Sequence, residues 1–346
     1  MTVKYLLLFL LLTHFTSCQT PLSKWSYDQF KKHQRSSDIH KKGYWDKWIN
    51  LPLEERVIEG TDEIIQFITD DNIYNHYRDR PSKIKLSAEN LAVIKEALAS
   101  LPSWIKKPIE DNITAIIILK DVGGSALTDK ILSFKNKGFI IFDIKTLTKS
   151  ANDWCTWKES SPFKEGTHKL KCIIEEERYN DKVGAFRYIF LHEAAHILNL
   201  STDILPYWNI DLKSEEEVEA YSFLKESWHL GKKSFLNQKR KYKRISFTPY
   251  YKEKDAVKNN LMLEYYKELS QSDFPTLYGT KNPWDDFAES YVNYIHTQVF
   301  KKPFRIEIYN KEKLVYTYKD CWNSKRCKKK KALLRNYLMD RRSKAN

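Results

Sequence analysis

Apolar residues recur every three or four positions between residues 183 and 198, the spacing that places side chains on one face of a helix. The apolar positions are Val183, Phe186, Ile189, Phe190, Ala194, Ile197 and Leu198. There is no Gly or Pro between Ala185 and Leu205. The pattern therefore predicts one uninterrupted helix that is buried along its apolar face.

Three other segments show simpler patterns. Residues 51–110 carry apolar residues at helical spacing, interrupted at Pro81 and Pro102, and predict a helical N-terminal part. Two short β-branched runs, 113–119 and 139–142, lie next to glycines and predict strands. Together with the long helix, these elements indicate an α+β fold with a small mixed sheet.

The composition is that of a folded protein. Of the 346 residues, 42% are hydrophobic and 14% are aromatic, which is enough to bury a core and excludes a disordered chain. Glycine is scarce, with nine residues, and the chain has no internal repeat. A compact, helix-rich fold is therefore expected rather than a repeat architecture.

The first eighteen residues resemble a bacterial export signal. Lys4 precedes an apolar run over 5–12, which is too short to span a bilayer as a helix. Cys18 follows Thr16 and Ser17 and resembles the lipobox cysteine that is acylated in bacterial lipoproteins. We therefore expect an exported protein of the bacterial cell envelope, anchored in the membrane by an acyl chain at Cys18, with simple secretion as the alternative.

Four further cysteines form an even set, which suits the oxidising compartment that an export signal implies. Three pairings are possible. We favour the two local ones, Cys155 with Cys172 and Cys321 with Cys327, because each closes a short loop. The segment 150–179 is then expected to be a loop excursion held by the first disulfide.

The net charge of +14 is concentrated near the C-terminus, where residues 322–346 contain ten Lys or Arg and one acidic residue. The run 328–331 is most simply the solvated face of a helix. The alternative is a surface that binds anionic lipid headgroups or acidic polymers. Because no nucleic-acid-binding motif accompanies the charge, no nucleic-acid partner is expected.

Polar residues within the long helix carry the candidate chemistry. His192 and His196 lie four residues apart on one helix face, so both imidazoles can bind one Zn²⁺ while Glu193 faces a water molecule. The ion lowers the pKa of the water, and the carboxylate accepts its proton as the water attacks a carbonyl. The alternative is an ordinary core helix with two hydrogen-bonded histidines, in which the burial of Glu193 would be costly.

The third zinc ligand has to come from another segment. Glu216 lies about twenty residues beyond His196, a separation that some zinc hydrolases use. Its acidic neighbours are more simply the first turn of a helix, where they complement the helix dipole. A second acidic helix is predicted to start with Asn282 as its N-cap and Pro283 at its first position.

The stretch 277–291 contains Tyr-Gly-x-x-Asn followed by Asp-Asp-Phe-Ala-Glu. Together with the His-Glu-Ala-Ala-His motif, this stretch resembles the anthrax lethal factor-like zinc peptidases, a branch of the zincins that includes secreted bacterial endopeptidases. The resemblance covers the motif residues and the general layout. It implies a zincin-like catalytic domain in which an edge strand borders the substrate cleft and can pair with an extended peptide.

The resemblance also implies roles for individual residues: zinc ligands at His192 and His196, the general base at Glu193, and a transition-state donor at Tyr278. Asp285 falls on the position of the third ligand. Glu289 falls one turn later, where it would hold a ligand imidazole. Two features depart from the family: Asp stands where the family has Glu, and the interval from the second histidine is longer. The alternative is that Asp285 only caps its helix as a third-position carboxylate, which leaves Glu289 as the third ligand.

These observations divide the chain into a signal (1–18), a tether (19–50), a helical N-terminal part (51–110), a zincin-like catalytic domain (111–320) and a basic C-terminal tail (321–346). The expected function is that of an exported zinc metallopeptidase, an endopeptidase that acts on protein or peptide substrates. The alternative is a catalytically degenerate zincin that serves as a binding or structural lipoprotein of the envelope.

The anchor gives the first prediction. Cys18→Ser should move the protein from the detergent-rich to the aqueous phase in a Triton X-114 partition, because the acyl chain would supply most of the membrane affinity. Unchanged partitioning of the variant would instead point to the basic C-terminal residues or to the absence of an anchor.

Overall fold

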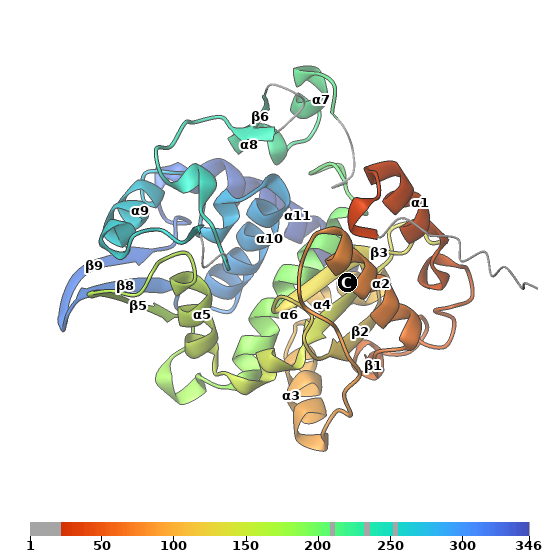
Figure 1. Ribbon diagram of the computed structural model, residues 1–346. Helices are drawn as coiled ribbons and strands as arrows, with labels where there is room; N and C mark the ends of the chain where they lie inside the picture. Colours follow the sequence, from red (N-terminus) through yellow and green to blue (C-terminus); the bar gives the residue numbers. More distant parts are fainter. Residues whose placement is uncertain (1–21, 208–211, 232–235, 252–254, 346) are drawn as a thin grey trace, which may run out of the picture.

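The computed structural model describes residues 22–207, 212–231, 236–251 and 255–345. Its centre is a four-stranded sheet with the order β1-β2-β4-β3. The strands are β1 (Val57–Glu59), β2 (Ile113–Leu119), β4 (Gly138–Asp143) and β3 (Ala126–Lys130). The first three are parallel, and β3 pairs antiparallel with β4 at the edge (Figure 1).

The central strand β2 explains why the sheet has helices on both faces. All seven of its residues are buried, and its sequence is a nearly continuous apolar run, as expected for a strand covered on both sides. Ile116 and Ile118 belong to the larger hydrophobic core, whereas Ile117 and Leu119 belong to a smaller one. Successive side chains therefore point into different cores across the sheet.

Different helices supply the two cores. The smaller core contains side chains from α2 (Asp62–Tyr74), and α1 (Tyr27–Ser36) stacks on α2 through Phe30 and Tyr74. The larger core contains α3 (Ala88–Ala99), α4 (Ser103–Asn112) and the long helix α6 (Lys182–Asn199). A Cβ at Gly138 would collide with Ile197 of α6, so this glycine lets α6 pack closely on the sheet.

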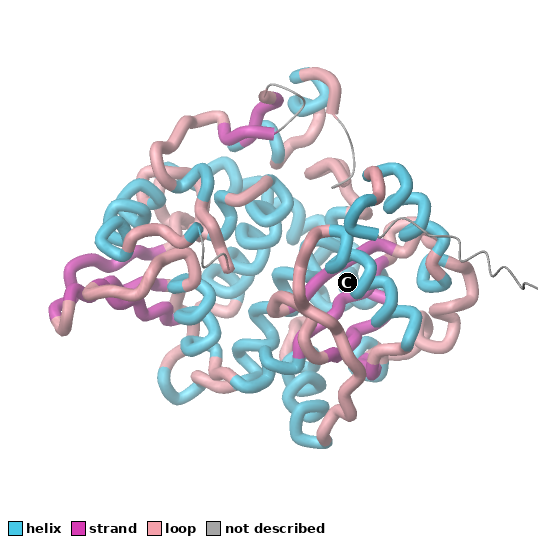
Figure 2. The backbone as a smooth tube through the Cα atoms, viewed as in Figure 1, coloured by secondary structure: helices cyan, strands magenta, loops and turns pink. Residues whose placement is uncertain are grey.

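The rest of the chain extends the larger core away from the four-stranded sheet (Figure 2). An antiparallel sheet with the order β5-β8-β9 lies at one end, and a short hairpin β6-β7 lies elsewhere. These strands are β5 (His168–Ile173), β6 (Trp228–Leu230), β7 (Leu236–Gln238), β8 (Arg305–Asn310) and β9 (Lys313–Lys319). The helices are α5 (Ala151–Ser160), α7 (Glu215–Glu219), α8 (Leu224–Ser227), α9 (Met262–Leu269), α10 (Pro283–Tyr294) and α11 (Lys328–Ala345).

Several predictions from the sequence are confirmed. The fold is α+β, the runs 113–119 and 139–142 are strands, and the predicted helix is α6. Disulfides join Cys155 to Cys172 and Cys321 to Cys327, the two local pairings. No described helix has the length and hydropathy needed to cross a membrane, and Cys18 lies outside the described residues.

The N-terminal segment differs from the expected tether over 19–50. Its described part folds onto the sheet, where Ile39 and Trp45 are fully buried. The Trp45 ring stacks on Phe139 of β4, and its Nε1 donates a hydrogen bond to the carbonyl oxygen of Ile39. Phe30 and Trp45 of this polar segment are therefore buried, whereas Tyr27 is 56% exposed. The sequence did not indicate the burial of Trp45, because its partner Phe139 is distant in the chain.

Other expected boundaries also differ. The segment 150–179 is not a loop excursion but contains α5 and β5, joined by the first disulfide. The division at 110/111 cuts through one sheet, because β1 pairs with β2. The basic C-terminal segment is the helix α11, in which Lys328 and Lys329 are exposed but Lys330 is buried against Asp286.

The packing of the N-terminal segment can be tested by its stability. Trp45→Ala should reduce the free energy of unfolding by about 3–5 kcal/mol, because it removes a fully buried indole from the smaller core. Urea unfolding of the protein without residues 1–18 measures the change. The control Trp157→Ala removes an indole that is 43% exposed and should cost no more than about 1 kcal/mol. Equal losses in the two variants would contradict this packing.

Candidate metal centre

The helix α6 brings two histidines together at the middle of the molecule. His192 and His196 are one turn apart, and their ring centroids are separated by 5.1 Å. The surrounding apolar residues bury this part of the helix on nearly all sides. Burial and the neighbouring His192 lower the pKa of His196 to about 4, so its imidazole is neutral at physiological pH and able to bind a metal.

The helix α10 supplies a carboxylate opposite the histidines. Asn282 caps the helix as predicted, accepting a hydrogen bond from the backbone N–H of Asp285. The Asn282 side chain also donates to Oδ2 of Asp285, at 2.7 Å. Oδ1 of Asp285 then faces the two histidines, at 3.9 Å from Nε2 of His192 and 3.8 Å from Nε2 of His196. One carboxylate thus both stabilises the helix start and faces the imidazoles.

These three side chains fit a zinc ion. One possible ligand atom from each of His192, His196 and Asp285 lies within 4.8 Å of the others. Around a tetrahedral zinc with bonds of about 2.0–2.1 Å, ligand atoms lie about 3.4 Å apart. The separations between the carboxylate and the imidazoles exceed this value by about half an ångström, which small side-chain rotations can remove. Two imidazoles and a carboxylate are also an established zinc donor set.

Glu289, one turn after Asp285, lies behind His192 rather than in this cluster. Its Oε1 is 2.9 Å from Nδ1 of His192 and 2.6 Å from Nζ of Lys158. Burial would raise the pKa of Glu289, but Lys158 and His192 outweigh it and lower the pKa well below its ordinary value. The 2.9 Å contact is an ion-pair distance, because Nδ1 of His192 has no partner with hydrogen-bond geometry among the described residues. A rotation of the ring would let Nδ1 donate to Glu289 and would leave Nε2 to face Asp285.

Glu193 is oriented by the edge strand. The hydroxyl of Thr128 in β3 donates a hydrogen bond of 2.6 Å to Oε2 of Glu193. Burial raises the pKa of Glu193 above its ordinary value, against the opposing effects of His192 and Thr128. A carboxylate with a raised pKa is better matched to proton transfer near neutral pH.

Tyr278 lies at the side of His192, with ring centroids 5.8 Å apart. It starts a short 3-10 helix, Tyr278–Thr280, just before α10. Two lysines hold its ring: Nζ of Lys158 is 4.5 Å and Nζ of Lys281 is 4.2 Å from the ring centroid. Lys281 also donates to the phenolic oxygen, at 3.0 Å. The structure therefore places Tyr278 beside the metal cluster.

Part of this cluster lines a cavity of about 220 Å³ that residues of the edge strand and of α5 also border. Its walls include His192, Glu193, Tyr278 and Glu289, and also Trp154 and Lys158 of α5. A second cavity of about 340 Å³ shares Gly123–Ser125, Trp154 and Tyr251 with the first and adds Trp157. The sequence interpretation missed α5, although Ser150 as an N-cap and Trp154, Trp157 and Lys158 at helical spacing were visible signals.

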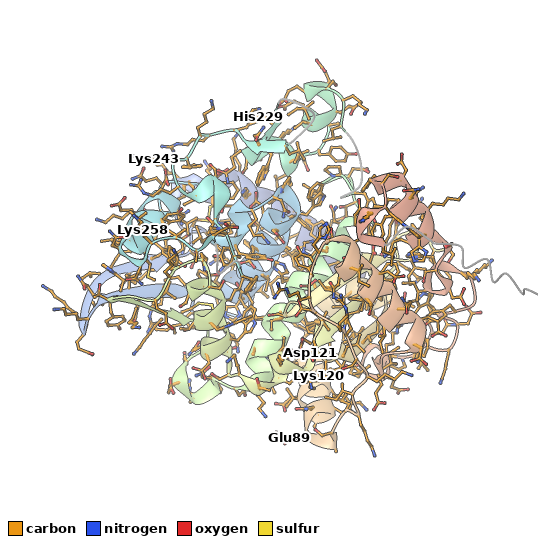
Figure 3. All side chains as sticks on the ribbon, viewed as in Figure 1. Glu89, Lys120, Asp121, His229, Lys243 and Lys258 are labelled. Carbon is orange, nitrogen blue, oxygen red and sulfur yellow. A yellow bond between two sulfur atoms is a disulfide. The ribbon has the colours of Figure 1, made fainter. Side chains whose placement is uncertain are left out.

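The other candidate ligand, Glu216, lies elsewhere, and so do three further histidines. Glu216 is exposed in the first turn of α7 and does not belong to the described metal cluster. His229 lies on β6 at the upper edge of the molecule, far from α6 in the view of Figure 3. His296 hydrogen-bonds to the carbonyl oxygen of Ile174, and His33 pairs with Asp70. Of the two α10 carboxylates considered as the third ligand, Asp285 and Glu289, only Asp285 joins the histidines in this cluster.

Comparisons with known proteins do not add to this description. No protein-family model, no curated protein and no solved structure matches the chain. The account of the site therefore depends on the geometry of its residues.

The geometry predicts an order of zinc affinities. Asp285→Ala should abolish stoichiometric zinc binding, because it leaves only two imidazoles. Glu289→Ala should weaken binding by about 10- to 100-fold, because it removes a partner of a ligand and not a ligand. Glu216→Ala is the matched control and should bind zinc like the parent. Titration against a chromophoric chelator measures all three, and the reverse order for Asp285 and Glu289 would place the ligand one turn later.

Proposed function

We propose that this protein is a zinc-dependent metallopeptidase with His192, His196 and Asp285 as its metal ligands. The observation that carries the proposal is that one possible ligand atom from each of these three side chains lies within 4.8 Å of the others. His192 of this cluster and the neighbouring Glu193 also line the cavity beside β3. A buried helix with two histidines and an adjacent glutamate would be costly to fold without a function for these groups. The resemblance to lethal factor-like peptidases points to the same reaction.

Each residue has a chemical task in this proposal. When bound, Zn²⁺ supplies the Lewis acidity that polarises a carbonyl and lowers the pKa of water. Glu193, held by Thr128, accepts the proton of the attacking water and delivers it to the leaving amine. Tyr278 donates a hydrogen bond to the oxygen on which negative charge develops. Glu289 keeps the His192 ring in the orientation that directs Nε2 at the metal.

The cleft supports a peptide as the substrate. The strand β3 pairs with β4 on one side and forms the edge of the sheet, so an extended peptide can add to its free side. Thr128 in the same strand contacts Glu193, so a peptide paired with β3 would pass close to the candidate base. The adjoining cavity, walled by Trp154, Trp157 and Tyr251, offers apolar surface to its side chains.

We further propose that the protein acts outside the cytoplasm as an envelope lipoprotein. The two disulfides are compatible with an oxidising compartment, which agrees with the export signal. The acyl anchor at Cys18 would place the catalytic cleft at the membrane surface, where the substrates would be exported proteins or peptides.

The proposed peptidase activity can be tested on protein that lacks the membrane anchor. The protein without its first eighteen residues should bind about one zinc ion and hydrolyse an unfolded protein or a peptide library, and a chelator should stop the hydrolysis. Glu193→Gln keeps the size of the side chain and all three ligands. It should therefore retain zinc but lose about 10²- to 10⁴-fold in rate, because no base accepts the proton.

Two results would refute this function. One is a purified parent protein that binds no zinc under conditions in which it is folded. The other is a Glu193→Gln variant as active as the parent, which would show that any hydrolysis observed arises from a contaminant or from another site.

A further inference from the structure

Lys158 is a buried lysine that the sequence motifs did not single out. It lies on α5 and is only 5% exposed, although a lysine in a protein interior requires compensating contacts. Its Nζ is 2.6 Å from Oε1 of Glu289 and 3.7 Å from Oε1 of Glu159. The same ammonium group lies 4.5 Å from the ring centroid of Tyr278. One cation therefore contacts residues on both sides of the candidate metal centre.

Of the two carboxylates near Lys158, Glu289 has fewer other hydrogen-bond partners than Glu159. Glu159 is held by the hydroxyls of Tyr250 and Tyr266, each of which donates a 2.9 Å hydrogen bond to its Oε2. Glu289 has its contacts with Lys158 and His192 through the same oxygen, Oε1, and its Oε2 has no hydrogen-bond partner among the described residues. Without Lys158, the orientation of the Glu289 carboxylate would depend on His192 alone.

The position of Lys158 is itself fixed. Cys155, one turn earlier on α5, is joined by a disulfide to Cys172 of β5. On the other side, α5 packs against α6, which carries the histidines. The ammonium group therefore extends from a helix that is attached to two neighbouring elements, and it can hold Glu289 in one place.

We propose that Lys158 is a positioning residue of the metal centre: it holds Glu289 against Nδ1 of His192 and supports the ring of Tyr278. This inference rests on the proposed zinc site. In this proposal α5 orients a ligand on α6 indirectly. Lys158 of α5 contacts Glu289, and Glu289 contacts the ligand His192. The charges agree with this role. Glu159 and Glu289 are buried carboxylates, and the ammonium group of Lys158 compensates their negative charge.

A matched control exists at another carboxylate of α10, Asp286. Lys330 is as deeply buried as Lys158 and pairs with Asp286, with its Nζ 2.7 Å from both carboxylate oxygens. Asp286 also accepts hydrogen bonds from Trp228 and Ser290, so its partners among the described residues lie away from both histidines. Lys330→Met therefore breaks an equally buried ion pair that also involves a carboxylate of α10. It removes no contact of His192.

The test compares zinc affinities of Lys158→Met, Glu289→Gln, the double variant and Lys330→Met, measured by competition with a chromophoric chelator. Lys158→Met and Glu289→Gln should each weaken zinc binding by about 10- to 100-fold. The double variant should be no more than about threefold weaker than either single variant, because both changes act through His192. Lys330→Met should bind zinc within about threefold of the parent, even though its fold is less stable.

A conservative variant and a spectrum separate positioning from general stability. Lys158→Arg keeps the positive charge and should recover at least half of the logarithmic affinity that Lys158→Met loses, whereas Lys158→Gln should not. The Co²⁺-substituted Lys158→Met protein should show an altered ligand-field absorption spectrum, and Lys330→Met should show that of the parent. If Lys158→Met does not fold, the comparison of Lys158→Arg with Lys158→Gln decides.

The outcomes that contradict the inference differ from those that contradict the proposed function. Zinc binding by the parent, with unchanged affinity in Lys158→Met or equal affinities in the Arg and Gln variants, would overturn the role of Lys158 and leave the zinc site intact. Losses that multiply in the double variant would also overturn it. A folded parent that binds no zinc would overturn both.

Discussion

The packing of α10 against α6 is the constraint on which the site depends. The two histidines on α6 would give a zinc ion only two protein ligands. The third ligand therefore has to come from another element whose position is fixed independently. Asn282 fixes the start of α10 and turns Oδ1 of Asp285 toward the imidazoles. Asp286 on the same helix pairs with Lys330 and Trp228, away from the histidines, and contributes to the packing of α10. The Asn282 contacts are therefore the ones that direct the Asp285 carboxylate at the histidines.

Buried charge is the second organising feature, because the interior contains carboxylates that water cannot solvate. Each has a specific partner: Glu289 has Lys158 and His192, Glu193 has Thr128, and Asp286 has Lys330. Pairs of this kind are costly to assemble and costly to break, so they specify a single arrangement more than they add stability. The two elements that supply the partners of Glu289 and Glu193, α5 and β3, are therefore as important for the site as the helix that carries the motif.

The sequence predicted the elements whose signals are local. The period of apolar residues identifies α6, a β-branched run identifies β2, and Asn-Pro identifies the start of α10. It did not predict α5, because this helix is short and largely polar and its aromatic residues face the cleft. Nor did it predict the burial of Trp45, whose partner Phe139 is distant in the chain. The sequence could not distinguish Asp285 from Glu289 as the candidate third ligand, because both lie on one helix face. Only their contacts with neighbouring residues distinguish them.

The most direct test of the account is the zinc K-edge X-ray absorption spectrum of the zinc-loaded protein. We expect a first shell of nitrogen and oxygen only, at about 2.0–2.1 Å, with the outer-shell scattering of two imidazole rings. All four cysteines of the described chain are in disulfides, so no sulfur should appear. Sulfur at about 2.3 Å, or a shell without imidazole scattering, would contradict a centre built from His192, His196 and Asp285.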